Sequence, residues 1–189
     1  MTYNKLDVGC GSRKRVGFLG MDIVKMDGVD IVHSMNVEPW PIPDNVMEEI
    51  IFDDVLEHSK DFLLILSEVY RVAKADCVIK ISVPHFSSDN MYTDPTHTTF
   101  FSSRSFNYFD KSQNHRHGFY LGHVNFKVVK SEIHFTEFFV PNDSKDKKWN
   151  PWKILGIQYL VNKFPRIYEK FLAWIFPAAE LYFELKVVK

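Results

Sequence analysis

The chain has 189 residues, of which 46% are hydrophobic and 25% charged, and its formal net charge at pH 7 is −1. These values are typical of one globular domain with a substantial core, so we expect a single domain over residues 1–189. The balanced charge excludes a broad basic surface, which argues against DNA as a partner and disfavours RNA. No apolar run approaches the ~20 residues of a spanning helix, so no membrane span is predicted.

The first half of the chain predicts short strands with little between them. Strands are expected at Lys5–Val8, Phe18–Asp22 and Asp30–His33. Only Ser12 to Phe18 separate the first two strands, which leaves hardly any room for a helix. The next elements are a fourth strand at Glu48–Asp53, a helix from an N-cap at Ser59 to Lys74, and a fifth strand at Cys77–Val83 that Pro84 ends.

The second half predicts a long polar loop, then strands and helices. Residues His85 to Gly118 are too many for a simple connection, so we expect an acceptor-binding loop with a short helix near Ser103–Phe109. The following elements are a strand or hairpin at Val124–Thr136, an exposed charged loop at Asn142–Asn150, helices over Pro151–Ala178 that Pro165 breaks and Pro177 stops, and a last antiparallel strand at Leu181–Val188.

The helices near the C-terminus predict a shared apolar face, formed by Phe164, Ile167, Tyr168, Phe171, Leu172 and Ile175. We expect this face to pack on the sheet. A helix on a membrane surface or against a partner is the alternative, disfavoured because acidic and basic residues are mixed in the segment. Three of the four tryptophans could form an apolar patch for an acceptor or for the second subunit of a homodimer; they are Trp149, Trp152 and Trp174.

Two glycines after the first strand indicate a ligand site. Leu6-Asp7-Val8-Gly9-Cys10-Gly11-Ser12 breaks a buried strand into a tight turn, and Asp22 ends the second strand. In a doubly wound sheet the two converge on one crevice, where the acid can bind both hydroxyls of a ribose. The third glycine of a pyrophosphate site is missing, so an adenosyl ligand without phosphate fits better.

Three segments in register resemble the class I S-adenosylmethionine (SAM) dependent methyltransferases, of the type 11-like group. Leu6–Gly11 resembles their motif I, Gly20–Ile23 their ribose-binding second strand, and Asp53–His58 the segment after their fourth strand. The resemblance implies an α/β, Rossmann-like sheet of seven strands, a SAM-binding core over residues 1–84, and acceptor loop, helices and last strands over 85–189. It also implies that the leading cover helices of the fold are missing and the first half is abbreviated.

The resemblance assigns SAM to Asp7, Gly9, Cys10, Gly11, Asp22, Ile23, Asn36, Val37, Asp53 and Asp54. Asn36 stands where the family usually has an acid that accepts a hydrogen bond from the adenine amino group. An asparagine carbonyl can accept that bond too, although an asparagine that only shapes a turn is an equal alternative.

Methyl transfer to a hydroxyl needs a general base, and two histidines are candidates. His58 follows the fourth strand, and His97 lies in the long loop, where Asp94 could orient its ring. Each could instead be a residue without a chemical role. Asp54, Glu57, His58 and His97 also resemble the Glu-x-x-Glu-His plus distal His that holds a divalent metal in small-RNA 2′-O-methyltransferases. Asp54 is shorter than the usual Glu, and we do not favour a metal.

The segment after the fourth strand lacks the (Asp/Asn)-Pro-Pro-aromatic sequence with which nucleobase amino methyltransferases grip nitrogen. The resemblance therefore favours an O-methyltransferase acting on a small hydroxylated or saccharide acceptor. An RNA methyltransferase and a catalytically silent SAM-binding or interaction module stay open. Cys10 and Cys77 form no CxxC motif, and no signal peptide precedes the first strand, so we expect reduced cysteines in a cytoplasmic protein.

Overall fold

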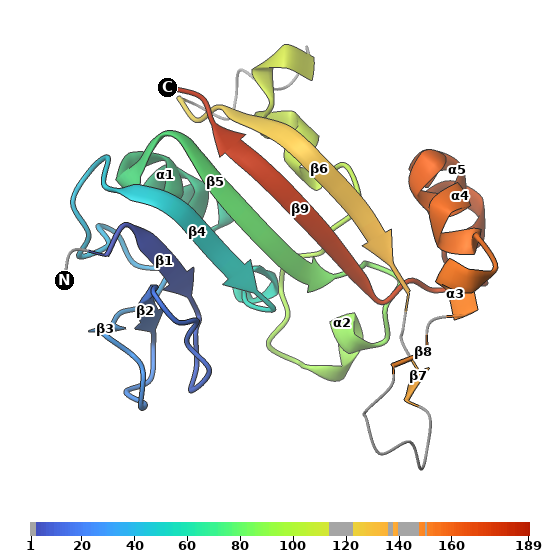
Figure 1. Ribbon diagram of the computed structural model, residues 1–189, viewed down its shortest axis with the longest axis horizontal. Coiled ribbons are helices and arrows are strands. Elements are labelled where there is room, and N and C mark those ends of the chain that lie inside the picture. The colour runs from blue at the N-terminus through green and yellow to red at the C-terminus, as the bar shows by residue number, and fades with distance from the viewer. Residues whose placement is uncertain (1–2, 114–122, 136–137, 140–147, 150) are drawn as a thin grey trace.

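A computed structural model describes residues 3–113, 123–135, 138–139, 148–149 and 151–189. Its centre is a seven-stranded sheet in the order β3-β2-β1-β4-β5-β9-β6 (Figure 1). Every strand is parallel to its neighbours except β9, which runs antiparallel to β5 and β6. The strands are β1 (Lys5–Val8), β2 (Leu19–Asp22), β3 (Ile31–Val32), β4 (Met47–Asp53), β5 (Ala73–Pro84), β6 (Phe126–His134) and β9 (Glu180–Val187). The predicted seven-stranded α/β sheet is confirmed.

The connections between the first four strands contain no helix, as expected from their length; residues 9–46 all lie in the described part. Helix α1 (Phe62–Val72) follows β4 and the short turn η1 (Leu56–His58). The predicted N-cap at Ser59 is wrong, because the Asp61 carboxylate accepts the hydrogen bond from the Leu64 N–H at 3.0 Å. The Ser59 hydroxyl lies 2.8 Å from that of Thr99 instead.

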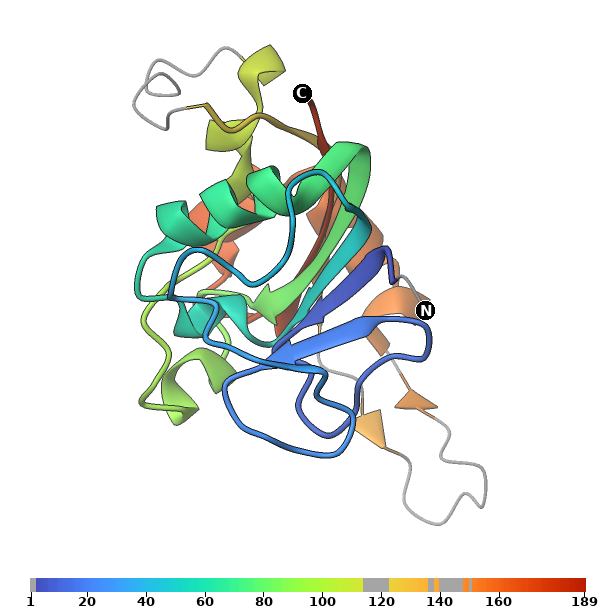
Figure 2. The ribbon, with the colours of Figure 1, turned by 90° about the vertical axis from the view of Figure 1, so that its left-hand side faces the viewer.

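The core lies on one face of the sheet, the face that α1 covers (Figure 2). Successive strand residues point to opposite faces, so Leu6, Val8, Ile50 and Phe52 are buried under α1. Figure 1 shows no helix in front of the other face among the described elements. Charged side chains cover it, and Glu49 there lies 2.8 Å from Lys5 and 2.7 Å from Lys80.

The loop after β5 returns over the α1 side of the sheet. It contains the short helix α2 (Asn90–Thr93) and the turns η2 (Ser105–Phe109) and η3 (Lys111–Gln113). Phe101 and Phe106 of this loop are buried and each meets Phe62 of α1 edge to face. The helix expected at 103–109 is present as the 3-10 turn η2, and the end of the predicted loop lies outside the described residues.

The helices after β6 pack at the edge of the sheet, beside β6 (Figure 1). They are α3 (Pro151–Ile154), α4 (Ile157–Lys163), α5 (Pro165–Ile167) and the π-helical turn η5 (Tyr168–Leu172). The break at Pro165 is confirmed, since α5 begins there. The Asn162 side chain accepts a 2.7 Å hydrogen bond from the Ile133 N–H and donates a 2.9 Å bond to the Ile133 carbonyl.

The expectation that these helices pack their apolar face on the sheet is wrong. Of the six residues predicted to form that face, only Tyr168 is buried. Asn162 bonds to the backbone of β6 and Val161 is buried, whereas most of the other apolar side chains of these helices are exposed. A two-stranded pair, β7 (Phe138–Phe139) and β8 (Lys148–Trp149), precedes them; the rest of the loop predicted at 142–150 lies outside the described residues.

Both cysteines are free and buried, in agreement with packing roles. Burial raises the pKa of the Cys77 thiol to about 12, so this thiol stays protonated and unreactive at neutral pH. Within the described ranges, no helix has both the length and the apolar character that crossing a bilayer requires.

Candidate functional site

The turn after β1 is built on left-handed glycines. Gly9 has φ +67° and Gly11 has φ +53°, a region that favours glycine. A β-carbon on Gly9 would lie 2.4 Å from Cγ2 of Val55, whereas one on Gly11 would meet nothing within 4 Å. Gly9 is thus required by packing as well as by conformation.

Asp22 ties this turn to the end of β2. One of its carboxylate oxygens accepts a 2.9 Å hydrogen bond from the Gly11 N–H, and the other accepts a 3.0 Å bond from the Val24 N–H. Each oxygen keeps a lone pair for a ligand hydroxyl. The turn and the acid converge, as the sequence predicts.

A cavity of about 510 Å³ opens beside Asp22, within the range of small-molecule sites. Five of the predicted cofactor residues line it, together with His33, Met35, His58 and Lys60; the five are Gly9, Asp22, Ile23, Asn36 and Asp54. The mixture of aliphatic side chains with a few polar groups suits a nucleoside.

A second cavity, of about 630 Å³, lies on the other side of the glycine turn. Six of the residues that the sequence analysis assigns to SAM line it, together with Arg13 and Arg15; the six are Asp7, Gly9, Cys10, Gly11, Asp53 and Asp54. Buried Asp7 accepts a 2.9 Å hydrogen bond from the Arg15 N–H, and the Arg15 guanidinium lies 2.8 Å from Asp53. Val37 lines neither cavity: its side chain is exposed, and its carbonyl lies 2.9 Å from Nε2 of His33.

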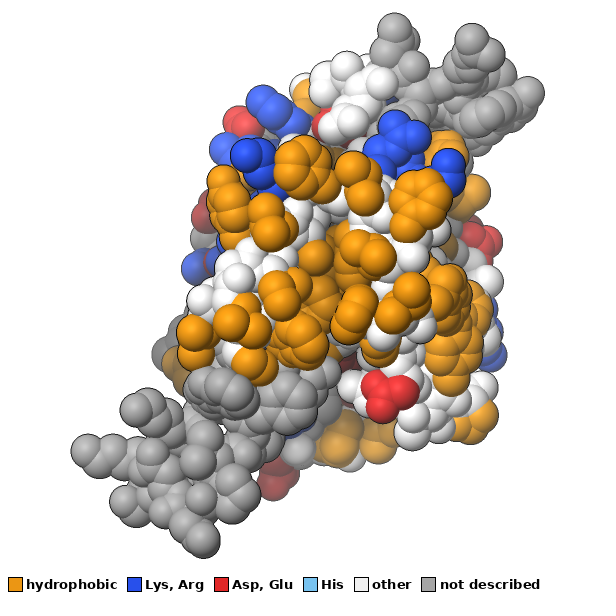
Figure 3. Space-filling view, turned by 90° about the vertical axis from the view of Figure 1, so that its right-hand side faces the viewer, with side chains coloured by type: hydrophobic (Ala, Val, Ile, Leu, Met, Phe, Trp, Pro, Cys, Tyr) orange, Lys and Arg blue, Asp and Glu red, His pale blue; other side chains and the backbone are white. Residues whose placement is uncertain are grey.

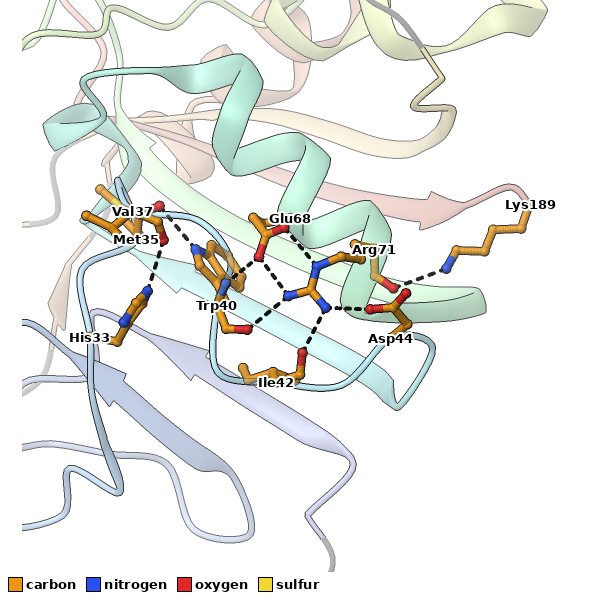
Figure 4. Close-up of polar contacts among 9 residues, drawn as sticks. All are labelled: His33, Met35, Val37, Trp40, Ile42, Asp44, Glu68, Arg71 and Lys189. Atoms are coloured by element: carbon orange, nitrogen blue, oxygen red, sulfur yellow. Dashed lines mark hydrogen bonds and ion pairs between the residues drawn. The ribbon is translucent and has the colours of Figure 1, made fainter.

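The loop between β3 and β4 forms one wall of the first cavity, and α1 holds it in place (Figure 4). The Trp40 N–H donates to Glu68 at 2.5 Å, and the Trp40 indole N–H donates to the Met35 carbonyl at 3.2 Å. Arg71 donates to the carbonyls of Trp40 and Ile42. Hydrogen bonding to the Arg71 guanidinium lowers the pKa of Glu68, so this pair stays charged at neutral pH.

Asn36, at the centre of this wall, already has a partner for its side-chain oxygen. That oxygen accepts a 2.7 Å hydrogen bond from the Lys60 N–H, which ties the loop to the segment before α1. A second lone pair remains for an adenine amino group, and the amide nitrogen can only donate.

Asp54 lies where three cavities meet. It lines both cavities above and a third one of about 610 Å³, whose other residues are Glu57, His58, Pro84, Asn90, Thr93, Asp94, Pro95 and His97. No other described residue lines all three. Its φ of +50° is rare for a residue other than glycine, and such strain is found at ligand sites. Burial, and then the charge of Asp53, raise the pKa of its carboxyl.

His97 points one ring nitrogen into the third cavity. Its Nδ1 lies 3.2 Å from the Met91 carbonyl, which can only accept, so Nδ1 carries the proton in the neutral ring and Nε2 keeps a free lone pair. Nε2 lies 3.9 Å from Oε1 of Glu57 and 4.0 Å from Oδ2 of Asp94. Met91, rather than Asp94, therefore orients the ring.

Asp94 acts instead on His58, through Thr96. The Thr96 hydroxyl donates to Asp94 at 2.7 Å and lies 2.8 Å from Nδ1 of His58. Hydrogen bonds from the Thr96 hydroxyl and from the Thr96 backbone N–H, the second at 2.8 Å, lower the pKa of Asp94. The rings of His58 and His97 meet edge to face with their centroids 4.7 Å apart, so the two predicted histidines share one site.

The burial of the Glu57 side chain is a property of this site that the sequence does not reveal. Its side chain is 1% exposed, and no hydrogen-bond partner reaches Oε2 among the described residues. Burial, followed by the nearby charges of Asp54, Asp53 and Asp94, raises its pKa to about 7. A carboxyl that titrates near neutrality can exchange a proton with a ligand in the cavity.

The ligand atoms of Glu57, His58 and His97 lie within 4.8 Å of one another and could hold a metal ion. Two imidazoles and one carboxylate suit a borderline cation such as Mn²⁺ or Zn²⁺. The fourth residue of the sequence-based set, Asp54, is not part of this group.

Comparisons with known proteins support the fold. No family model and no curated relative match the chain by sequence. A SAM-dependent methyltransferase from Archaeoglobus fulgidus is similar in structure, with 18% identity over 98% of this chain and 88% of that one, and a TM-score of 0.53. One from Mesorhizobium loti has 11% identity over 97% and 90%, with a TM-score of 0.52.

The chain has the class I methyltransferase fold. The same fold carries other chemistry: the [4+2]-cyclase SpnF is similar over 97% of this chain and 75% of that one, with 15% identity and a TM-score of 0.52. A reaction must therefore be argued from the side chains of the site. Within this class I fold, the cavities lie where open α/β sheets bind ligands, outside the carboxyl ends of the strands.

Proposed function

We propose that the protein is a SAM-dependent methyltransferase that methylates an oxygen of a small hydroxylated or saccharide acceptor. The position of Asp54 carries this proposal, because a donor in the first two cavities and an acceptor in the third would meet at this residue. Methyl transfer is an in-line displacement, for which the protein has to align two reactants.

SAM would occupy the first two cavities. The ribose hydroxyls would bind Asp22, the adenine would contact the wall around Met35 and Asn36, and the methionine part would lie along the glycine turn. Arg13 and Arg15 line that second cavity and would attract the methionine carboxylate. The sulfonium methyl group would then point past Asp54.

The acceptor oxygen would attack the methyl carbon while the carbon–sulfur bond breaks, which leaves S-adenosylhomocysteine. Both rings bond through Nδ1 and keep a lone pair on Nε2; the buried Glu57 carboxyl beside Nε2 makes His97 the favoured acceptor of the hydroxyl proton, and His58, with its partner Thr96, is the second candidate. Glu57, with a pKa of about 7, could then take the proton or stabilise the imidazolium across the 3.9 Å between them.

Titration calorimetry with SAM and S-adenosylhomocysteine tests the cofactor, and transfer of a tritiated methyl group to saccharides, phenols and RNA tests the acceptor. We expect binding of both cofactor forms and incorporation into a hydroxylated small molecule. Binding without transfer to any acceptor would favour a silent SAM-binding module. Incorporation into RNA alone would replace the proposed acceptor class.

A further inference from the structure

The segment between β8 and β9, residues 151–177, carries a large apolar surface. Eleven large hydrophobic side chains are between 41% and 69% exposed there. They are Ile154, Leu155, Tyr159, Leu160, Phe164, Ile167, Phe171, Leu172, Trp174, Ile175 and Phe176. Figure 3 shows hydrophobic side chains across the middle of this face of the molecule. Such an area marks an interaction site on a folded protein.

The charges within this segment have one sign at the surface. Its basic residues, Lys153, Lys163, Arg166 and Lys170, are all exposed. The acid that makes the sequence look mixed is Glu169, whose side chain is 7% exposed. The Ser103 N–H donates to it at 2.5 Å, and buried His85 lies 3.6 Å away. Every exposed residue between Lys153 and Pro177 is therefore hydrophobic or basic.

We propose that this face, residues 151–177, docks on the surface of an anionic lipid bilayer. Aromatic and aliphatic side chains beside lysine and arginine are what an interfacial segment presents to acyl chains and headgroups. Lys163 lies over the rings of Tyr159 and Phe164, and Lys170 over that of Phe171, so the cations lie directly beside the apolar side chains. Among the described residues, no carboxylate pairs with Lys163, Arg166 or Lys170.

A groove next to this surface adds a site for a headgroup. It has a volume of about 480 Å³ and combines the cations Arg104, Lys163 and Arg166 with the apolar side chains Phe164 and Ile167. Lipid phosphates are attracted to such a basic groove. A second copy of the chain fits less well, because a two-fold contact would bring the same basic residues together from both subunits.

The surface also adjoins the proposed acceptor side. The Trp174 ring meets that of Phe86 edge to face at 5.5 Å, and Phe86 follows Pro84 of the third cavity closely in the chain. The docking proposal does not depend on the reaction, and its test needs no substrate.

Flotation with vesicles tests the proposal directly. The full chain should float with phosphatidylcholine vesicles that contain about one quarter phosphatidylglycerol, much less with phosphatidylcholine alone, and less as salt is added. Reversal of two cations in the surface, Lys163→Glu with Lys170→Glu, should weaken binding ~10-fold or more. The matched control is Lys25→Glu with Lys127→Glu, two exposed positions elsewhere with the same change of net charge, which should float more strongly than the first pair.

The apolar contribution is tested with Phe171→Ser and Ile175→Ser, both at exposed positions where folding should be unaffected; circular dichroism and thermal melting check this. We expect these changes to abolish flotation. Equal binding by both charge-reversal pairs, or full binding by the serine variants, would overturn the proposal. So would absence of flotation together with a concentration-dependent dimer that the serine changes dissociate, which would make the face a contact between copies.

Discussion

Nε2 of His97 and Oε1 of Glu57 face each other across 3.9 Å at the edge of the third cavity. The distance is too long for a direct hydrogen bond and short enough for one atom, a ligand oxygen or a metal ion, to bridge. Which of the two it is decides how the site would work.

Replacement of His97 by alanine should lower the rate of methyl transfer by ~10²–10⁴ and leave SAM affinity unchanged, since the side chain lies on the acceptor side. Initial rates and calorimetry on the same preparation measure both effects. Chelator treatment should change neither. Loss of activity with chelator and recovery with Mn²⁺, with Glu57→Ala and His58→Ala behaving like His97→Ala, would instead identify a metal site.

Glu57→Gln should change how stability depends on pH. The pKa of Glu57 is raised from 4.5 to about 7 in the folded state, so the folded protein binds this proton more tightly than the unfolded chain does. The resulting contribution to stability is fully present below about pH 4.5 and is lost as the pH rises through about 7. The variant should therefore gain stability relative to the parent between these values, by on the order of 3 kcal/mol. Denaturant unfolding across this range measures the difference.

Glu38→Gln, at an exposed position, is the control for that experiment and should follow the parent at every pH. A Glu57→Gln variant that also follows the parent would mean that the carboxyl ionises in the folded protein much as in the unfolded chain.

Asp22→Ala should weaken SAM binding at least ~100-fold, because two charge-assisted hydrogen bonds to the ribose are each worth ~1.5–3 kcal/mol. Asp30→Ala is the matched control. Asp30 also accepts a backbone bond, from the Gly20 N–H at 2.7 Å, but it does not line the cavity. Its loss should lower the melting temperature and leave SAM affinity nearly intact. Equal affinities for both variants would remove Asp22 from the site.

Gly9→Ala should destabilise the protein more than Gly11→Ala. Both positions have positive φ, but only the β-carbon at Gly9 would collide with Val55. Val55→Ala should therefore restore part of the stability lost in Gly9→Ala and none of that lost in Gly11→Ala. Gly9→Val should abolish SAM binding as well. Melting temperatures of the single and double variants test this, and equal losses at both glycines would show that backbone strain alone is at work.

The strands were predictable because their signal is local. Alternating or continuous apolar residues between turn residues place β1 within the bounds expected from the sequence, and β4, β5 and β9 within a few residues of them. The start of α1 was not, because the Ser59 hydroxyl has a competing partner in Thr99, forty residues away in the chain. The pattern of residues around Ser59 cannot predict a contact with so distant a residue.

The candidate site was predictable only in part, for a similar reason. The glycine turn and Asp22 follow from spacing along two neighbouring strands, whereas the burial of Glu57 depends on the loop that carries His97. The apolar face near the C-terminus illustrates the same limit: periodicity shows which residues share a side of a helix, but not what lies opposite. Because Glu169 is buried against Ser103 and His85, the exposed charges of that face are all basic, which the sequence alone does not show.

The bonds between Asn162 and the backbone of Ile133 affect how copies of this chain can meet. β6 is one of the two outer strands of the sheet, and an unpaired N–H and carbonyl on an outer strand can pair with a strand of another molecule. The amide of Asn162 satisfies both groups of Ile133, at 2.7 Å and 2.9 Å, so a second strand cannot pair there without displacing α4. Asn162 thus protects this edge against strand-by-strand aggregation, and an Asn162→Ala chain would be more prone to form β-rich polymers.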